Sequence, residues 1–227
     1  MNTFFDFVRG GGWVMYPLLL LSVGAVAVII ERLIAFRALA YLAPGLLASV
    51  TKLVKSGRLE EAQLQCDAER GPLAASLSTI LRHRNRPVGV AERQVEEIGS
   101  DYFAKMERFL PFLDTVTTIS PLLGLLGTIV GMIGTFNAIA VQQTRGNSDA
   151  VLSGVGEALY ATATGITIAV VCFIAYNFFA SKLRSTTSET ELAATRLINV
   201  LTDEGFFTTD RLTANEVNGE VQSATRA

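Results

Sequence analysis

The chain has 227 residues, of which 50% are hydrophobic and 18% are charged, and its formal net charge is -2. This composition is more apolar than that of an ordinary soluble domain, so it predicts a membrane protein. The near-neutral charge and the absence of a basic stripe laced with aromatic residues argue against nucleic-acid binding.

The first hydrophobic segment covers residues 13–30 and follows a short N-terminal segment, residues 1–12. Its length is about the minimum for a helix that crosses a hydrocarbon core of about 30 Å. Only Arg9 precedes the segment, whereas Arg32 and Arg37 follow it, which is the reverse of a cleaved secretory signal. We therefore expect a retained transmembrane helix.

Residues 31–110 are too charged for lipid but are patterned for helices. The apolar positions predict a short helical pair interrupted at Ser56–Gly57, with further breaks at Gly71–Pro72 and at residues 86–89. This segment is therefore expected to be a set of helices outside the lipid.

The end of that segment carries a longer helical pattern. From Glu92, apolar residues recur every three to four positions as far as Leu113, which is one stripe of a helix. We expect this helix to continue into the second span. Pro111 and Pro121 are expected to bend it, because each removes one backbone hydrogen bond.

The second and third spans are assigned to residues 111–140 and 151–181. Each lies in a stretch of about 30 residues with at most one charge, which exceeds the roughly 20 needed to cross a bilayer. Residues 141–150 contain the turn-forming run GNSD, so the two spans are expected to form a helical hairpin. Residues 182–227 continue a helical pattern and become polar and aperiodic from Thr208, where we expect disorder.

The positions of Lys and Arg predict the orientation. The segment between spans one and two carries Arg32, Arg37, Lys52, Lys55, Arg58, Arg70, Arg82, Arg84, Arg86, Arg93, Lys105 and Arg108, whereas the hairpin loop carries only Arg145. The positive-inside rule then places the N-terminus and the loop in the periplasm and residues 31–110 and 182–227 in the cytoplasm. The expected fold is an all-α membrane protein with three transmembrane helices, two of them extended into a cytoplasmic helical bundle.

Glu157 is the only charged residue between Asp149 and Lys182. A charge near the middle of a spanning helix costs about 2.5 to 3.5 kcal/mol on insertion scales, so such a residue usually faces protein or water and handles ions. The alternative is an acid near the start of a helix, where the helix dipole favours it. We expect Glu157 to line an ion or proton pathway.

Thr162 and Thr128 are the other candidates for lining this pathway. Their hydroxyl groups could bind water or a passing ion beside Glu157. The alternative is that each threonine bonds back to a carbonyl one turn earlier in its own helix. Thr128 becomes a stronger candidate for lining the pathway only if the second and third spans line the same pathway.

The second span also carries a helix-packing motif of four glycines at spacings of three, four and three: Gly124, Gly127, Gly131 and Gly134. A smooth face of this kind allows two helices to approach closely. One three-helix subunit can scarcely surround a hydrated carboxylate, so several copies or the helix of a second protein are implied.

No phosphate-binding loop, catalytic acid pair or nucleophile motif occurs in the sequence. The single histidine, His83, lies within the basic run RHRNR outside the spans. We therefore expect that the protein is not an enzyme, and that it has no cofactor and no metal site. Any work would draw on an ion gradient or on another subunit.

Two motifs in the hairpin resemble a known family. The run ISPLLGLLGTIVGM at residues 119–132 is similar to the second-span pattern S-P-x-x-G-L-x-G-T-V-x-G, and GVGEALYATATG at residues 154–165 is similar to the third-span pattern G-I-A-E-A-L-x-A-T-A-x-G. With the three-span layout, they identify a resemblance to the MotA/TolQ/ExbB proton-channel family, closest to ExbB and TolQ. The likeness covers nearly the whole chain, more weakly over residues 41–91 and not past Phe207.

The resemblance implies a pentamer in the bacterial inner membrane that encloses the single spanning helices of an ExbD- or TolR-type dimer. By position, Glu157 matches the family's pore-side glutamate, and Thr128 and Thr162 match its polar pore threonines. Protons would titrate an aspartate on the partner helix, and the output would pass to a TonB- or TolA-type protein. Ser153 stands where many relatives have proline.

Several functions stay open at this point. The leading one is an ExbB-like subunit that powers TonB-dependent transport, and the nearest alternative is a TolQ-like subunit of the Tol-Pal system for envelope integrity and division. A passive ion channel or membrane scaffold is a third reading. A flagellar stator fits less well, because that branch carries four spans and a larger cytoplasmic domain.

Overall fold

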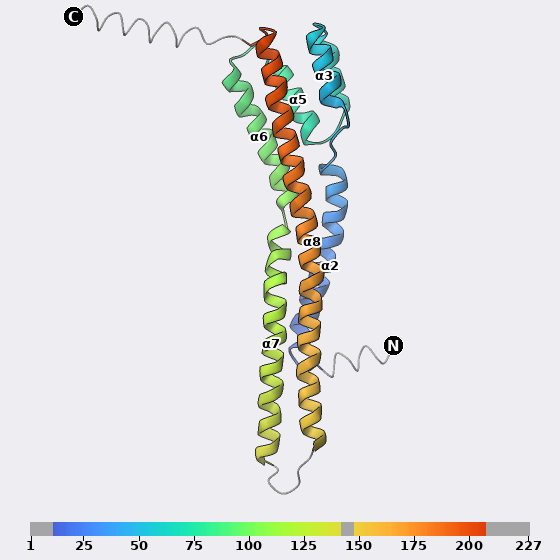
Figure 1. Ribbon diagram of the computed structural model, residues 1–227, viewed down its shortest axis with the longest axis vertical. Helices are drawn as coiled ribbons and strands as arrows, with labels where there is room; N and C mark the ends of the chain where they lie inside the picture. Colours follow the sequence, from blue (N-terminus) through green and yellow to red (C-terminus); the bar gives the residue numbers. More distant parts are fainter. Residues whose placement is uncertain (1–10, 142–147, 208–227) are drawn as a thin grey trace, which may run out of the picture. The chain divides into compact units, whose positions relative to one another are not determined.

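The computed structural model describes residues 11–141 and 148–207, and the regular secondary structure of these ranges is α-helical (Figure 1). The helices are α2 (Met15–Leu39), α3 (Leu46–Lys55), α4 (Leu59–Ala68), α5 (Pro72–Arg82), α6 (Val88–Glu107), α7 (Leu110–Val141) and α8 (Ser148–Asp203). The predictions for residues 1–10, 142–147 and 208–227 lie outside the described residues. The all-α class is confirmed.

Three stretches of the described chain are long and apolar enough to cross a membrane, and they include α2, α7 and the first part of α8. The predicted number of candidate spanning helices is therefore confirmed for the described residues. Helix α8 alone has 56 residues. At about 1.5 Å per residue it is roughly 84 Å long, so it extends well beyond a hydrocarbon core of about 30 Å.

The chain divides into two compact units, which are described separately. Unit 1 comprises Met1–Ile34 and Glu107–Ser181, and unit 2 comprises Ala35–Met106 and Lys182–Ala227. Unit 1 thus holds most of α2, all of α7 and the first part of α8. Unit 2 holds α3 to α6 and the end of α8.

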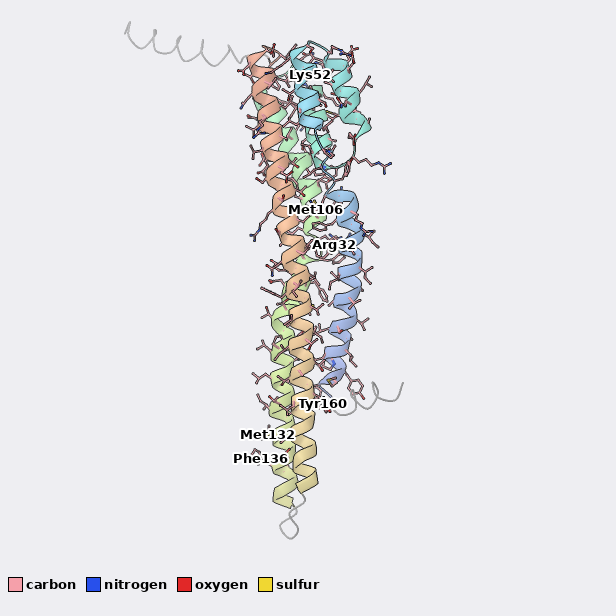
Figure 2. The ribbon with its side chains drawn as sticks, turned by 45° about the vertical axis from the view of Figure 1, so that its right-hand side comes forward. Arg32, Lys52, Met106, Met132, Phe136 and Tyr160 are labelled. Atoms are coloured by element: carbon pink, nitrogen blue, oxygen red, sulfur yellow. The ribbon has the colours of Figure 1, made fainter. Side chains whose placement is uncertain are left out.

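Unit 1 brings its helices close together at glycines and leaves many of its large apolar side chains exposed. A methyl group on Gly24 of α2 would lie 3.4 Å from Cζ of Phe112 on α7, and one on Gly127 of α7 would lie 3.6 Å from Val14. Helices α2 and α7 are therefore antiparallel and in close contact. In contrast, Leu20 is 73% exposed and Phe136 projects from α7 away from α8 (Figure 2). Such surfaces suit lipid or other subunits.

The expected continuous helix from Glu92 into the second span is wrong. Helix α6 ends at Glu107, and a turn at Arg108 and Phe109 precedes α7. Pro111 accounts for the break, because it has no N–H to donate and its ring would clash with the carbonyl of residue 107 in a continuous helix. Pro121, in contrast, lies inside α7, which continues through it.

Unit 2 is a set of helices around its own apolar core. The core draws on α3, α4, α5, α6 and α8, and includes Val50, Val54, Ala62, Cys66, Leu77, Ile80, Ala91, Leu197 and Leu201. Helix α5 is its centre, since nearly every residue from Pro72 to Leu81 is buried.

The predicted breaks between these helices are confirmed at two glycines with positive φ. Gly57 (φ 72°) ends α3, where the amide of Arg58 donates to the carbonyl of Leu53. Gly71 (φ 102°) precedes Pro72, the first residue of α5, and any side chain at this position would strike the carbonyl oxygen of Tyr41. Only glycine meets both requirements at residue 71.

Candidate functional site: the seam between α7 and α8

Small residues form the contact between α7 and α8, which lie side by side and antiparallel in unit 1 (Figure 1). A methyl group on Gly124 would lie 3.0 Å from Cα of Thr162, and one on Gly131 would lie 3.1 Å from Cβ of Ala158. One on Gly127 would overlap the side chain of Ala161. The structure thus places three of the four predicted packing glycines directly against α8.

The fourth predicted packing residue, Gly134, lies differently. A methyl group there would meet no described atom within 4 Å. At this end of the pair the close contact comes from Thr135, whose side chain occupies the space that a methyl group on Gly154 would need. The hydroxyl of Thr135 is buried and donates to the carbonyl of Gly131 at 3.0 Å.

Thr162 binds α7 directly. Its hydroxyl oxygen lies 3.0 Å from the carbonyl oxygen of Gly124 and donates a hydrogen bond to it. The bond is possible because Gly124 has no side chain and the two backbones almost touch. Thr162 therefore stabilises the helix pair in this structure.

Thr128 bonds within its own helix. Its hydroxyl donates to the carbonyl of Leu125 at 2.7 Å, which is the structural alternative considered for it in the sequence. Thr128 lies one turn after Gly124, the acceptor for Thr162. The hydroxyl groups of the two threonines therefore bond to different carbonyls of α7.

Glu157 lies in the first part of α8, but its side chain falls outside the described residues. Its neighbours Ala158 and Ala161 are buried against Gly131 and Gly127. Thr162 follows Glu157 by five residues, or about 140° around the helix axis. The backbone position of Glu157 is therefore at the edge of the α7–α8 contact.

Two residues of the seam were missed by the sequence reasoning. A methyl group on Gly165 would overlap the carbonyl oxygen of Ser120 and lie 3.2 Å from Cα of Gly124. Ser120 is fully buried, and its hydroxyl has no hydrogen-bond partner among the described atoms. Gly154, Ala158, Ala161 and Gly165 are small residues at spacings of four, three and four, which places them on one face of α8, and this is the signal that could have identified Gly165.

A separate polar cluster lies in unit 2. The carboxylate of Asp67 accepts hydrogen bonds from Ser78 (2.6 Å), Gln63 (3.1 Å) and Arg82 (3.0 Å). These bonds, above all the one from Ser78, hold the pKa of Asp67 below its ordinary value. A cavity of about 520 Å³ lies beside them, and it includes none of the residues predicted to line the pathway.

The seam carries the residues by which the chain can be compared with known proteins. The model of the MotA/TolQ/ExbB proton channel family matches residues 68–192, which include both hairpin motifs. The chain belongs to this family. The matched residues include all of α7 and much of α8, and the protein is a multi-pass membrane protein.

Relatives from two branches of the family are similar to the chain. An ExbB-like biopolymer transport protein of Synechocystis is 32% identical over 78% of this chain and 70% of its own length. The biopolymer transport protein ExbB of Salmonella typhimurium is 39% identical over 41% of this chain and 36% of its own. The Tol-Pal system protein TolQ of Pseudomonas aeruginosa is 42% identical over 34% and 33%.

Proposed function

We propose that the chain is an ExbB-like proton-channel subunit of the bacterial inner membrane. With an ExbD-type partner, it would use the proton motive force to energise TonB-dependent transport across the outer membrane. The observation that carries this proposal is the α7–α8 hairpin, in which the family motifs coincide with the tightest helix contact of unit 1. The protein would act as a channel and motor subunit and not as an enzyme.

The proposed arrangement is a homopentamer around the spanning helices of the partner. The exposed apolar surfaces of α2, α7 and α8 support assembly, because one copy covers little of its own spans. The N-terminus would lie in the periplasm and the helices of unit 2 in the cytoplasm, as the Lys and Arg distribution predicts.

Glu157 would shape the field along the proton path, while the partner helix brings the acid that titrates. We predict that Glu157→Gln lowers TonB-dependent uptake at least tenfold and leaves assembly with the partner intact. The measurement is energy-dependent uptake in cells that depend on this gene, together with co-purification of the partner.

The matched control is Glu191→Gln, which makes the same change of charge at an exposed position of the same helix. The control is expected to retain full uptake. Full uptake by an assembled Glu157→Gln protein would contradict the role of Glu157. A protein that works without any single-span partner would contradict the motor proposal and favour a passive channel or scaffold.

A TolQ-like role in the Tol-Pal system is the second candidate, because the identity to the Pseudomonas TolQ is as high as that to the Salmonella ExbB. The two roles predict different partners beyond the channel. Capture of a TonB-type protein in a pulldown of the tagged chain supports the ExbB-like role, whereas capture of a TolA-type protein supports the TolQ-like role.

A further inference from the structure

Phe109 adopts a backbone conformation that bulky residues rarely adopt. Its φ is 67°, and within residues 11–141 and 148–207 it is the one residue other than glycine with a positive φ. In this left-handed region Cβ crowds the following carbonyl oxygen. Pro111 explains why a turn is needed here, but a glycine would make the same turn without strain.

Two arginine side chains contact the ring of Phe109. Cζ of Arg108 lies 4.7 Å from the ring centroid, and Cζ of Arg32 lies 5.4 Å from it. Both distances are within the range in which a guanidinium group is attracted to the face of an aromatic ring. Arg32 comes from α2, so the ring connects the end of the first span to the start of α7.

Arg32 is itself held in place. It is 3% exposed, and its Nε and Nη2 atoms donate to the carboxylate of Glu31 at 2.5 and 2.6 Å. A buried guanidinium group requires such compensation, because an isolated buried charge is costly. Figure 2 marks Arg32 on α2. Glu31 and the ring of Phe109 thus stabilise the buried guanidinium group of Arg32, which would otherwise be more stable in water.

We propose that Arg32, Arg108 and Phe109 form a strained latch that fastens α2 to the start of α7 within unit 1. The two arginines hold the ring and so keep Phe109 in its left-handed conformation. The backbone strain acts in the opposite direction and favours opening. A strained residue that is held by its surroundings is typical of segments that change between two conformations.

The test measures the distance between α2 and α7 with spin labels in the intact protein. Ile30 on α2 and Thr115 on α7 are exposed residues of unit 1 near the latch and serve as label sites after replacement by cysteine in a background without Cys66 and Cys172. Pulsed electron paramagnetic resonance in lipid nanodiscs then gives a distribution of distances, whose width reports opening of the latch.

Two replacements of Phe109 separate the effect of the arginine–ring contacts from the effect of the backbone strain at residue 109. Phe109→Leu removes the ring but keeps a side chain in the left-handed region, whereas Phe109→Gly removes both the ring and the strain. The latch predicts that the leucine variant broadens the distribution at least twofold, and that the glycine variant broadens it less. Phe136→Leu, at an exposed phenylalanine of α7 far from the turn, is the matched control and is expected to leave the distribution unchanged.

A distribution in Phe109→Leu as narrow as that of the unmodified protein would overturn the proposal, and so would equal broadening in both variants. Arg32→Met gives a second route should the leucine variant fold poorly, because it keeps Phe109 and removes one cation. Broadening is expected there too, and its absence would also count against the latch. Because no step measures proton flow, failure of the latch is distinguishable from failure of the proposed function.

Discussion

Thr162 shows how one hydroxyl group can serve either a pathway or a helix contact. In this structure it donates to the carbonyl of Gly124 on α7, and this residue has no side chain that would keep the two helices apart. While it donates to Gly124, this hydroxyl can still accept a hydrogen bond from water, because its oxygen keeps its lone pairs. A role for Thr162 as a hydrogen-bond donor in the pathway therefore requires that it leave Gly124, whereas a role as an acceptor does not.

The bond between Thr162 and Gly124 gives a prediction about stability. Thr162→Val keeps the shape of the side chain but removes the donor, and we expect a loss of roughly 0.6 to 1.7 kcal/mol, as for other hydrogen bonds between spanning helices. Thr162→Ser keeps the donor and is expected to be close to the unmodified protein. Unfolding in mild detergent, followed by circular dichroism, measures both, and equal stability of the valine variant would show that the bond contributes nothing.

Asp67 gives a prediction about pH. Its pKa in the folded protein lies below the value of about 3.9 for an unfolded aspartate, chiefly because Ser78 donates to the carboxylate. The carboxylate therefore contributes stability in full above about pH 4 and loses it as the pH falls through the lower, folded pKa. We expect the free energy of unfolding to decrease as the pH falls below about 4, and Asp67→Asn to reduce this pH dependence.

The comparison variant for that measurement is Asp101→Asn. Asp101 accepts a hydrogen bond from Lys105, and both side chains are more than half exposed, so this ion pair is expected to contribute little. If Asp67→Asn and Asp101→Asn respond to pH alike, the cluster around Asp67 has no special role in stability.

Individual partners of this kind could not be predicted from the sequence. Thr162 was singled out as a pathway residue, but its partner Gly124 is 38 residues away and depends on how closely two helices approach. The same holds for Phe109, because no pattern in the sequence indicates that a phenylalanine would take a conformation suited to glycine.

The helices themselves were largely predictable, since apolar length and periodicity determine them. The three spans and the breaks at Gly57 and Gly71 follow from such local signals. The continuous helix through residue 108 was wrong because the apolar stripe continues across a turn that Pro111 imposes. The steric effect of one proline outweighed a periodic pattern of more than five turns.

The α7–α8 pair gives a prediction about element packing. Gly165→Ala would place a methyl group against the carbonyl of Ser120, where backbone atoms cannot move aside cheaply. We expect it to destabilise the protein by about 1 to 3 kcal/mol, as overpacking usually does. The measurement is again unfolding in detergent.

Gly134→Ala is the matched control on the other helix. A methyl group there meets no described atom within 4 Å, so the higher helix propensity of alanine should leave stability unchanged or raise it by up to about 1 kcal/mol. If both variants have the same stability, close approach at Gly165 does not determine how the helices pack.

At the scale of the whole molecule, the uncovered apolar surface of the spans predicts self-association. Large side chains such as Leu122, Ile133, Phe173 and Ile174 are more than half exposed within one chain. We expect native mass spectrometry in lipid nanodiscs to give an oligomer, with five copies as the family resemblance implies. A monomer that stays active in reconstituted membranes would contradict this prediction.

The α7–α8 seam also bears on the order in which the helices pair while the protein is being synthesised. Its close contacts join residues between 19 positions apart, for Thr135 and Gly154, and 45 positions apart, for Ser120 and Gly165, whereas Gly24 on α2 contacts Phe112, which lies 88 residues later in the sequence. Contacts that are local in the sequence form sooner. The first span must therefore persist alone in the bilayer during synthesis, while the last two can pair as soon as they leave the ribosome.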